Sequence, residues 1–385
     1  MRAGTIIIAG SLAQRPGYGG HAWVFLQWLL GFRRLGYEVL FLDWLDDAMC
    51  RDRAGRSCEI EHSWNLSYLS GVMREAGLAN AWSLDCNCGA LTLGRSRAEV
   101  LEIADRAELL INVMGFLSDA EILNKPRKRV FLDIDPGFGQ MWHELGLATI
   151  FGRHDAYITI GENIGRADCT IPLCGLKWIT TPQPVVLEHW SATPAPADAA
   201  FTSIVNWRGP FGPVEYAGKT YGLRVHEFRK FTALPQLTGQ QFELALDIDA
   251  SDANDIALLR DTGWLLTDPR TVVSEPSDYR AYIQRSKAEL MVAKNMYVQS
   301  NSGWVSDRSI CYLASGKPVL AQDTGFSKNY PTGEGLLAFT TLDEAQAGVE
   351  KIRRDYDAHC RAARAIAEKH FDSDKVLSAL LQKLR

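Results

Sequence analysis

The stretch Asn301–Phe326, NSGWVSDRSICYLASGKPVLAQDTGF, predicts a short helix followed directly by a buried strand. Gly316 ends the helix, because glycine adopts the left-handed conformation of a C-terminal cap at little cost. Pro318 prevents the helix from continuing and begins the apolar strand. Ligands of open α/β sheets bind at the carboxyl ends of strands, so the loop after this strand, Asp323-Thr324-Gly325, is a candidate binding loop.

The start of this helix, expected at Ser306 or Asp307, has the properties of an anion-binding site. Its first N–H groups have no partner within the helix and the dipole makes this end partly positive, which suits a diphosphate. Arg308 and Ser309 could add a charge-assisted contact and a hydroxyl group. The Asp307 carboxylate would compete with a phosphate, and it could instead cap the helix or hold Arg308. An ordinary capped helix that packs on a sheet is the alternative interpretation.

The length and composition of the chain predict a globular protein of two domains. A chain of 385 residues is too long for one typical core, and 46% hydrophobic with 23% charged residues is a globular composition. The net charge of −5 without a basic stripe gives no indication of nucleic-acid binding. Eight scattered cysteines without a CxxC pair predict reduced thiols in a cytoplasmic protein, and the histidines show no metal-ligand spacing. We expect no signal peptide and no membrane span, because no apolar run reaches roughly 18 residues.

A βαβ unit opens the chain. Thr5–Ala9 reads as a buried strand, Gly10–Gly20 as a glycine-rich loop, Ala22–Leu35 as an apolar helix and Glu38–Asp43 as a second strand. This order predicts a parallel sheet with helices on both faces. A dinucleotide-binding fold with Asp43 at the ribose is an alternative, but the loop lacks GxGxxG and is too long for a tight turn.

Strands and helices continue to alternate through the first half of the chain. The expected elements are helices Arg97–Arg106 and Asp119–Leu123 and strands Leu109–Val113, Arg129–Ile134 and Ala156–Gly161. The domain boundary is expected at two proline-rich segments with few helix signals, Thr180–Pro184 and Thr193–Pro196.

The alternation then restarts, which predicts a second α/β domain. The expected strands are Phe201–Val205, Gln241–Leu246, Glu289–Ala293 and Leu336–Phe339, and the expected helices are His226–Leu234, Asp252–Thr262, Tyr279–Ser286, Leu342–Tyr356 and Ala358–Leu384. We therefore expect an α/β fold with two Rossmann-like doubly wound domains, 1–190 and 198–357, that face a central cleft. Residues 358–385 are expected to form a C-terminal helix that packs back on the first domain.

Two such domains, with a glycine loop early and a capped helix late, resemble a GT-B glycosyltransferase. Ser306–Pro318, SDRSICYLASGKP, is similar to the donor-binding helix of family-four and family-one enzymes, which ends in small-Gly-x-Pro-Val. A motif series that resembles uncharacterised bacterial glycosyltransferases covers Ala293–Val298, Ser302–Ser309, Leu313–Phe326 and Pro331–Leu336. The resemblance is stronger in the second half of the chain. It implies that the first domain binds an acceptor and the second a nucleotide-sugar donor.

The chain departs from both families at the ribose. The glutamate that family-four enzymes place seven residues before the proline is Cys311 here. The ribose contact would then come from elsewhere, and Glu334 is the candidate, with Asp323 behind it.

The resemblance implies that a helix end and basic side chains, without a bound metal, stabilise the diphosphate as the bond to the sugar C1 breaks. Arg308, Ser309 and Lys294 are expected around this diphosphate. The loop Asn206-Trp207-Arg208 follows the second domain's first strand, where relatives often place donor contacts. A solvated Lys294 and a packed Trp207 are the alternatives.

The glycine loop of the first domain is expected to hold the catalytic base. Gly19 and Gly20 would let backbone N–H groups approach the donor phosphates. Inverting relatives often carry a histidine base in this position, so a neutral His21 could deprotonate an acceptor hydroxyl. Asp135, or Asp133, is the expected orienting acid. In a retaining enzyme His21 would instead contact the transferred sugar, and a capping histidine on a plain turn is the non-catalytic alternative.

We therefore expect a metal-independent glycosyltransferase with no cofactor besides its nucleotide-diphosphate-sugar co-substrate. The acceptor would carry a hydroxyl group and could be a small molecule, a natural product or a glycan. An epimerase or hydrolase of the same fold, or a non-catalytic nucleotide-sugar-binding protein, are the alternatives. A homodimer is left open.

Overall fold

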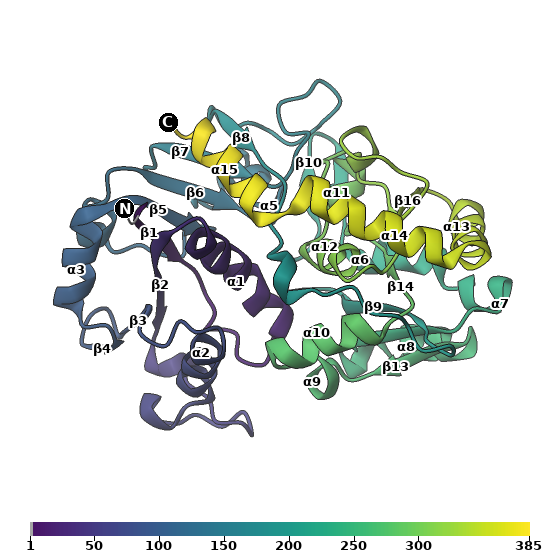
Figure 1. The fold of residues 1–385 in the computed structure, drawn as a ribbon, viewed down its shortest axis with the longest axis horizontal. Helices are drawn as coiled ribbons and strands as arrows, with labels where there is room; N and C mark the ends of the chain where they lie inside the picture. Colours follow the sequence, from purple (N-terminus) through teal and green to yellow (C-terminus); the bar gives the residue numbers. More distant parts are fainter. Residues whose placement is uncertain (1–2) are drawn as a thin grey trace.

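Two largely parallel sheets form the frame of the computed structural model, which describes residues 3–385 (Figure 1). The first sheet has the order β4 (Leu91–Gly94), β3 (Trp82–Cys86), β2 (Tyr37–Leu45), β1 (Ala3–Ala9), β5 (Ala107–Val113), β6 (Arg129–Asp133), β7 (Ala156–Thr159) and β8 (Trp178–Thr180). The second has the order β13 (Trp264–Thr267), β12 (Phe242–Asp247), β9 (Phe201–Asn206), β14 (Ala288–Met291), β15 (Val319–Gln322) and β16 (Leu336–Phe339). After β9 the chain adds β12 and β13 on one side of that strand, and then β14, β15 and β16 on its other side. The strand order therefore reverses between β9 and β14, and this is the switch point of the second sheet.

Period-two burial along β1 explains the layers of the first domain. Ile6 and Ile8 belong to the larger core, together with residues of α1 (Gly19–Arg34), α2 (Trp64–Glu75) and α5 (Phe138–Glu144). Ile7 and Ala9 face a smaller core with α3 (Arg97–Arg106) and α4 (Ala120–Leu123). Alternate residues of a strand point to opposite faces, so this apolar strand needs helices on both sides.

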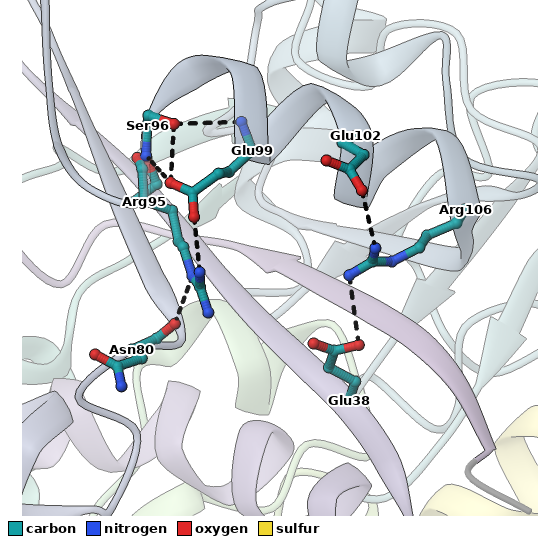
Figure 2. A network of polar contacts seen from close by, with 8 residues as sticks. Glu38, Asn80, Arg95, Ser96, Glu99, Glu102 and Arg106 are labelled. Carbon is teal, nitrogen blue, oxygen red and sulfur yellow. Dashed lines mark hydrogen bonds and ion pairs between the residues drawn. The ribbon is translucent and has the colours of Figure 1, made fainter.

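A capping box fixes the start of α3, the helix that was expected over Arg97–Arg106. The Ser96 N–H donates to Glu99 Oε2 at 2.9 Å, and Ser96 Oγ accepts from the Glu99 N–H at 3.4 Å (Figure 2). Arg95 reaches the same carboxylate from the preceding loop at 2.7 Å. At the other end of the helix, Arg106 lies between Glu102 and Glu38 of β2.

The second domain surrounds its sheet with short helices and a two-stranded ribbon. The ribbon is β10 (Val214–Tyr216) with β11 (Lys219–Tyr221), and the helices up to β15 are α6 (Arg224–Phe228), α7 (Leu234–Thr238), α8 (Ala253–Asp261), α9 (Pro269–Val272), α10 (Pro276–Arg285), α11 (Asn295–Gln299) and α12 (Asp307–Ala314). The single helix expected over 226–234 is wrong. The structure breaks it into α6, a 3-10 turn and α7, with Pro235 in the first turn of α7, where its missing N–H costs nothing.

The C-terminal helices lie across both domains, as the yellow ribbon shows (Figure 1). They are α13 (Leu342–Arg354), α14 (Tyr356–Ile366) and, after a π-helical turn over Ala367–Phe371, α15 (Ser373–Lys383). α14 packs on α12 and β16, whereas α15 lies on α1, where Arg34 Nε donates to Asp374 at 3.0 Å. The chain thus returns to the first domain near residue 372, later than residue 358. Within residues 3–385, no helix combines the length and apolar character that a bilayer-spanning segment requires.

Candidate functional site

A cavity of about 630 Å³ lies between the two domains. The first domain contributes Gly17–His21, Ile134 and Gln183 to its wall. The second contributes the carboxyl ends of β9 and β12, together with Arg224, Arg270, Asp307 and Arg308. This volume and this place, at the switch point of an open sheet, are those of a small-molecule site. Another cavity, of about 420 Å³, is lined by the first domain alone, from Leu42 to Ile122, and therefore cannot be shared between the domains.

Arg308 is held at the cavity wall by the second sheet. Its Nε donates to Glu289 of β14 at 2.6 Å and its Nη1 to the Ile204 carbonyl of β9 at 2.8 Å. Burial disfavours the charge, but the adjacent Glu289 outweighs it, so the pKa of Arg308 is raised and the group stays cationic. Its Nη2 is buried and finds no hydrogen-bond partner within the described residues.

Arg224, the first residue of α6, is a second buried guanidinium at the same wall. Only 9% of its surface is exposed, and its Nε has no hydrogen-bond partner among residues 3–385. Burial, and then the nearby Arg308, lower the pKa of Arg224 to about 10, so it remains charged at neutral pH. Buried polar groups are normally paired. Two adjacent cationic guanidiniums that line the cavity make this wall suited to an anion.

The two glycines of the first-domain loop permit a close contact between domains. The Gly19 N–H donates to the Val273 carbonyl at 3.1 Å, so this donor is already used. A Cβ at Gly19 would lie 2.4 Å from the Glu275 carbonyl oxygen, and one at Gly20 would lie 2.7 Å from the Tyr279 ring. Both residues line the cavity, but glycine is required here because the loop packs closely against the second domain.

His21 lines the cavity as a neutral imidazole. Its Nε2 lies 3.2 Å from the Ser11 carbonyl and 3.1 Å from Ser11 Oγ. A carbonyl can only accept, so Nε2 carries the proton and Nδ1 is the unprotonated nitrogen. Burial lowers the pKa of His21 to about 4.

The expected pairing of His21 with Asp135 is wrong. Asp135 accepts from Lys294 Nζ at 2.8 and 3.1 Å and from the Tyr297 hydroxyl, across the domain interface. The alternative acid, Asp133, is buried and accepts from Gln140 and Thr159 inside the first domain, at 2.7 and 2.8 Å. His21 therefore has no orienting carboxylate among residues 3–385.

Other residues expected to contact the donor have different partners. Lys294 is bonded to Asp135 and lies over the Phe138 ring, outside the cavity lining. Trp207 is 1% exposed and donates to Asp255 at 2.9 Å, so it is a packing residue. Arg208 makes a bidentate contact with Asp252, whereas Asn206 does line the cavity.

Five further residues around α12 and β15 that were expected to contact the donor, Ser306, Ser309, Asp323, Thr324 and Gly325, lie outside the cavity wall. Ser306 caps α12 by accepting from the Arg308 N–H, and Ser309 is fully buried. Asp323 accepts from the Gly325 N–H and the Ser327 hydroxyl, and the Thr324 hydroxyl donates to the Trp304 carbonyl. None of these residues is part of the described cavity wall.

Glu334 is also outside the cavity, because it precedes β16 and so lies at the amino edge of the parallel sheet. Asp307 does line it, and burial raises the pKa of this carboxyl group.

The sequence interpretation missed five residues of the cavity wall: Arg224, Gln183, Asp247, Asp249 and Arg270. Asn206 was selected because it follows the second domain's first strand, and the same reasoning applied to the end of β12 would have found Asp247. Arg224 had no such signal. Among residues 3–385, no group of three or more His, Cys, Asp or Glu residues is placed to hold a metal ion.

Comparisons with known proteins agree with this architecture. Residues 263–382 match the family described as "Glycosyl transferase-like". Three similar solved structures are sucrose-phosphate synthase from Thermosynechococcus elongatus (12% identity, TM-score 0.56), HepE from Anabaena with UDP-glucose (12%, 0.58) and an alpha-glucosyltransferase with UDP (11%, 0.60). Each alignment covers 99% of both chains. No match was found among curated proteins. The chain thus has the GT-B fold, its residues 263–382 match the glycosyl transferase-like family, and together these findings indicate a glycosyltransferase.

Proposed function

We propose that the protein transfers a sugar from a nucleotide-diphosphate sugar to a hydroxyl group of an acceptor, with the donor in the interdomain cavity. The observation that carries this proposal is the pair of cationic guanidiniums, Arg224 and Arg308, that lie next to each other at the cavity wall. A diphosphate supplies the opposite charge and acceptor oxygens for guanidinium groups. The similar structures that contain UDP or UDP-glucose support a uridine nucleotide.

The chemistry required of this wall is stabilisation of a leaving group. As the bond between the sugar C1 and the diphosphate breaks, the electron pair stays on the diphosphate, and the acceptor oxygen bonds to C1 and loses its proton. Two guanidiniums at the cavity wall, Arg308 in the first turn of α12 and Arg224 at the start of α6, face this growing negative charge. They supply its stabilisation without a bound metal.

His21 acts in this proposal as a hydrogen-bond acceptor for a hydroxyl group in the cavity. Its unprotonated Nδ1 can accept, since Nε2 is committed to Ser11. With a pKa of about 4 and no carboxylate partner, it provides little driving force for proton abstraction. This favours the sugar-contact role over that of a general base.

The test is calorimetry with UDP, dTDP and GDP, followed by nucleotide release from the corresponding donor sugars. We expect one nucleotide to bind and, at 100 times its Kd, to stabilise the protein by about 2.7 kcal/mol. Binding should weaken in Arg308→Lys, which loses the planar fork, and turnover should persist in EDTA. Absence of binding by all three, or affinity that is insensitive to both arginines, would contradict the proposal.

A further inference from the structure

A second interdomain cavity, of about 590 Å³, adjoins the one assigned to the donor. Both are lined by Tyr18, Asn206, Asp247 and Asp249, so the two spaces meet at these residues. The second cavity alone is lined by Gln14 and Arg15 of the first domain, and by Arg208–Pro210 and Asp252 of the second. Resting on the proposed function, we propose that this cavity binds the acceptor and that the acceptor is an uncharged carbohydrate.

Polar side chains of this cavity are fixed by hydrogen bonds to the protein and keep polar atoms free to bind a ligand. Gln14 Nε2 donates to the buried Asp43 at 3.0 Å, which leaves its Oε1 open as an acceptor. Asn206 Nδ2 donates to Asp247 Oδ2 at 3.0 Å, and Asn206 Oδ1 accepts from the Gly209 N–H at 2.6 Å. Asp247 keeps its second oxygen as an acceptor, and the exposed Arg15 supplies donors. Closely spaced acceptors and donors of this kind match neighbouring hydroxyl groups.

The charges of the cavity favour a neutral ligand. Its wall carries two arginines and three aspartates. Arg208 and Asp252 neutralise each other through a bidentate contact, which leaves Arg15 with Asp247 and Asp249. A phosphorylated or carboxylated acceptor would meet two carboxylates and a single guanidinium, so a negative charge is not favoured.

The aromatic surface available here also suits a sugar better than a flat apolar molecule. Trp207 is 1% exposed and offers no ring face to the cavity. Tyr18, at 51% exposure, is the large apolar side chain at the junction of the two cavities. One tyrosine ring can pack against the C–H face of a pyranose while polar neighbours bind its hydroxyl groups.

The experiment is saturation-transfer NMR on the UDP-bound protein with methyl glucoside, methyl galactoside, methyl mannoside, glucose 6-phosphate and p-nitrophenol. Turnover with UDP-sugars and the same acceptors is measured in parallel. We expect at least one neutral pyranoside to bind and to be glycosylated. Gln14→Ala and Arg15→Ala should each raise its Kd or KM about 5- to 10-fold, the effect of one hydrogen bond. Their Kd for UDP should not change, because neither residue lines the donor cavity.

Arg260→Ala is the matched control, since Arg260 is exposed on α8 and lines neither cavity. The acceptor proposal is overturned if only the phosphate or the phenol binds and reacts, if no saccharide does, or if both substitutions leave saccharide affinity unchanged. Each of these outcomes leaves UDP binding, and so the donor assignment, standing. Loss of UDP binding itself would remove both proposals.

Discussion

Replacing Arg224 with methionine should stabilise the nucleotide-free protein. The pKa of Arg224 falls from its ordinary 12.5 to about 10 on burial. The difference, 12.5 − 10, is about 2.5 units, or about 3 kcal/mol at about 1.4 kcal/mol per unit. Both folded and unfolded states are charged below pH 10, so this cost is present throughout the neutral range. Methionine keeps the apolar stem and removes the charge. Allowing about 1–2 kcal/mol for imperfect packing, we expect a net gain of about 1–2 kcal/mol and a Tm higher by about 2–6 °C.

The same substitution should weaken nucleotide binding. A charge-assisted hydrogen bond contributes about 1.5–3 kcal/mol, which corresponds to a Kd for UDP raised about 10- to 150-fold. A residue that destabilises the free protein and strengthens the complex is the signature of a binding group. A residue that serves packing would lower both stability and affinity.

Arg229→Met provides the matched comparison in the turn that follows α6. Arg229 makes a bidentate pair with Asp255 at 2.8 Å and lies outside the cavity. Its loss leaves Asp255 with fewer partners, so Tm should fall while the Kd for UDP stays unchanged. Thermal unfolding without nucleotide and calorimetry with UDP measure both quantities. A lower Tm for Arg224→Met, together with a Kd within twofold of the parent protein, would refute the reasoning.

Three further substitutions test the interface and the glycine loop. The pKa of His21 is about 4 in the folded and about 6.5 in the unfolded protein, so the folding stability that the neutral imidazole contributes is complete above pH 6.5 and is lost as the pH falls towards 4. His21→Gln cannot lose this contribution, so urea unfolding should show the variant destabilised by acid less than the parent protein, by up to about 3 kcal/mol. Asp135→Asn should cost about 1–3 kcal/mol by thermal unfolding, and a double-mutant cycle with Lys294→Met should show coupling; additive effects would contradict the contact. Gly19→Ala should separate the domains, raising the radius of gyration in solution scattering and the Kd for UDP, whereas Gly212→Ala, whose Cβ meets nothing within 4 Å, should change neither.

The regular elements could be predicted wherever their signals are local. The helix expected over Arg97–Arg106 has the bounds of α3, and the apolar run Leu336–Phe339 coincides with β16. Ser306 caps α12 as its sequence indicates. The prediction for segment 226–234 failed because a 3-10 turn, Arg229–Phe231, divides an otherwise helical pattern. Such breaks depend on tertiary packing more than on propensity.

The cavity wall was predicted less well, because its residues meet across the domain interface. The position of Asp135 after a parallel strand places it correctly at the edge that faces the second domain. No local sequence pattern shows that Lys294 and Tyr297 of that domain donate to the Asp135 carboxylate in place of His21. Arg224 illustrates the opposite case. Its importance comes from having no partner, and the absence of a contact leaves no pattern in a sequence.

The contacts between the domains also determine how a ligand would reach the cavity. The Gly19 N–H and the Trp23 indole of the first domain donate to carbonyls of Val273 and Pro276 at 3.1 and 2.9 Å. These bonds join protein groups and hold the glycine loop against the second domain, so the cavity wall is assembled by the chain's own contacts. Assembly in advance favours affinity, because binding need not order the loop. It also slows access, since any opening that admits a ligand must break these bonds and the Asp135–Lys294 pair. Weakening that pair should therefore speed nucleotide association more than it changes the equilibrium affinity.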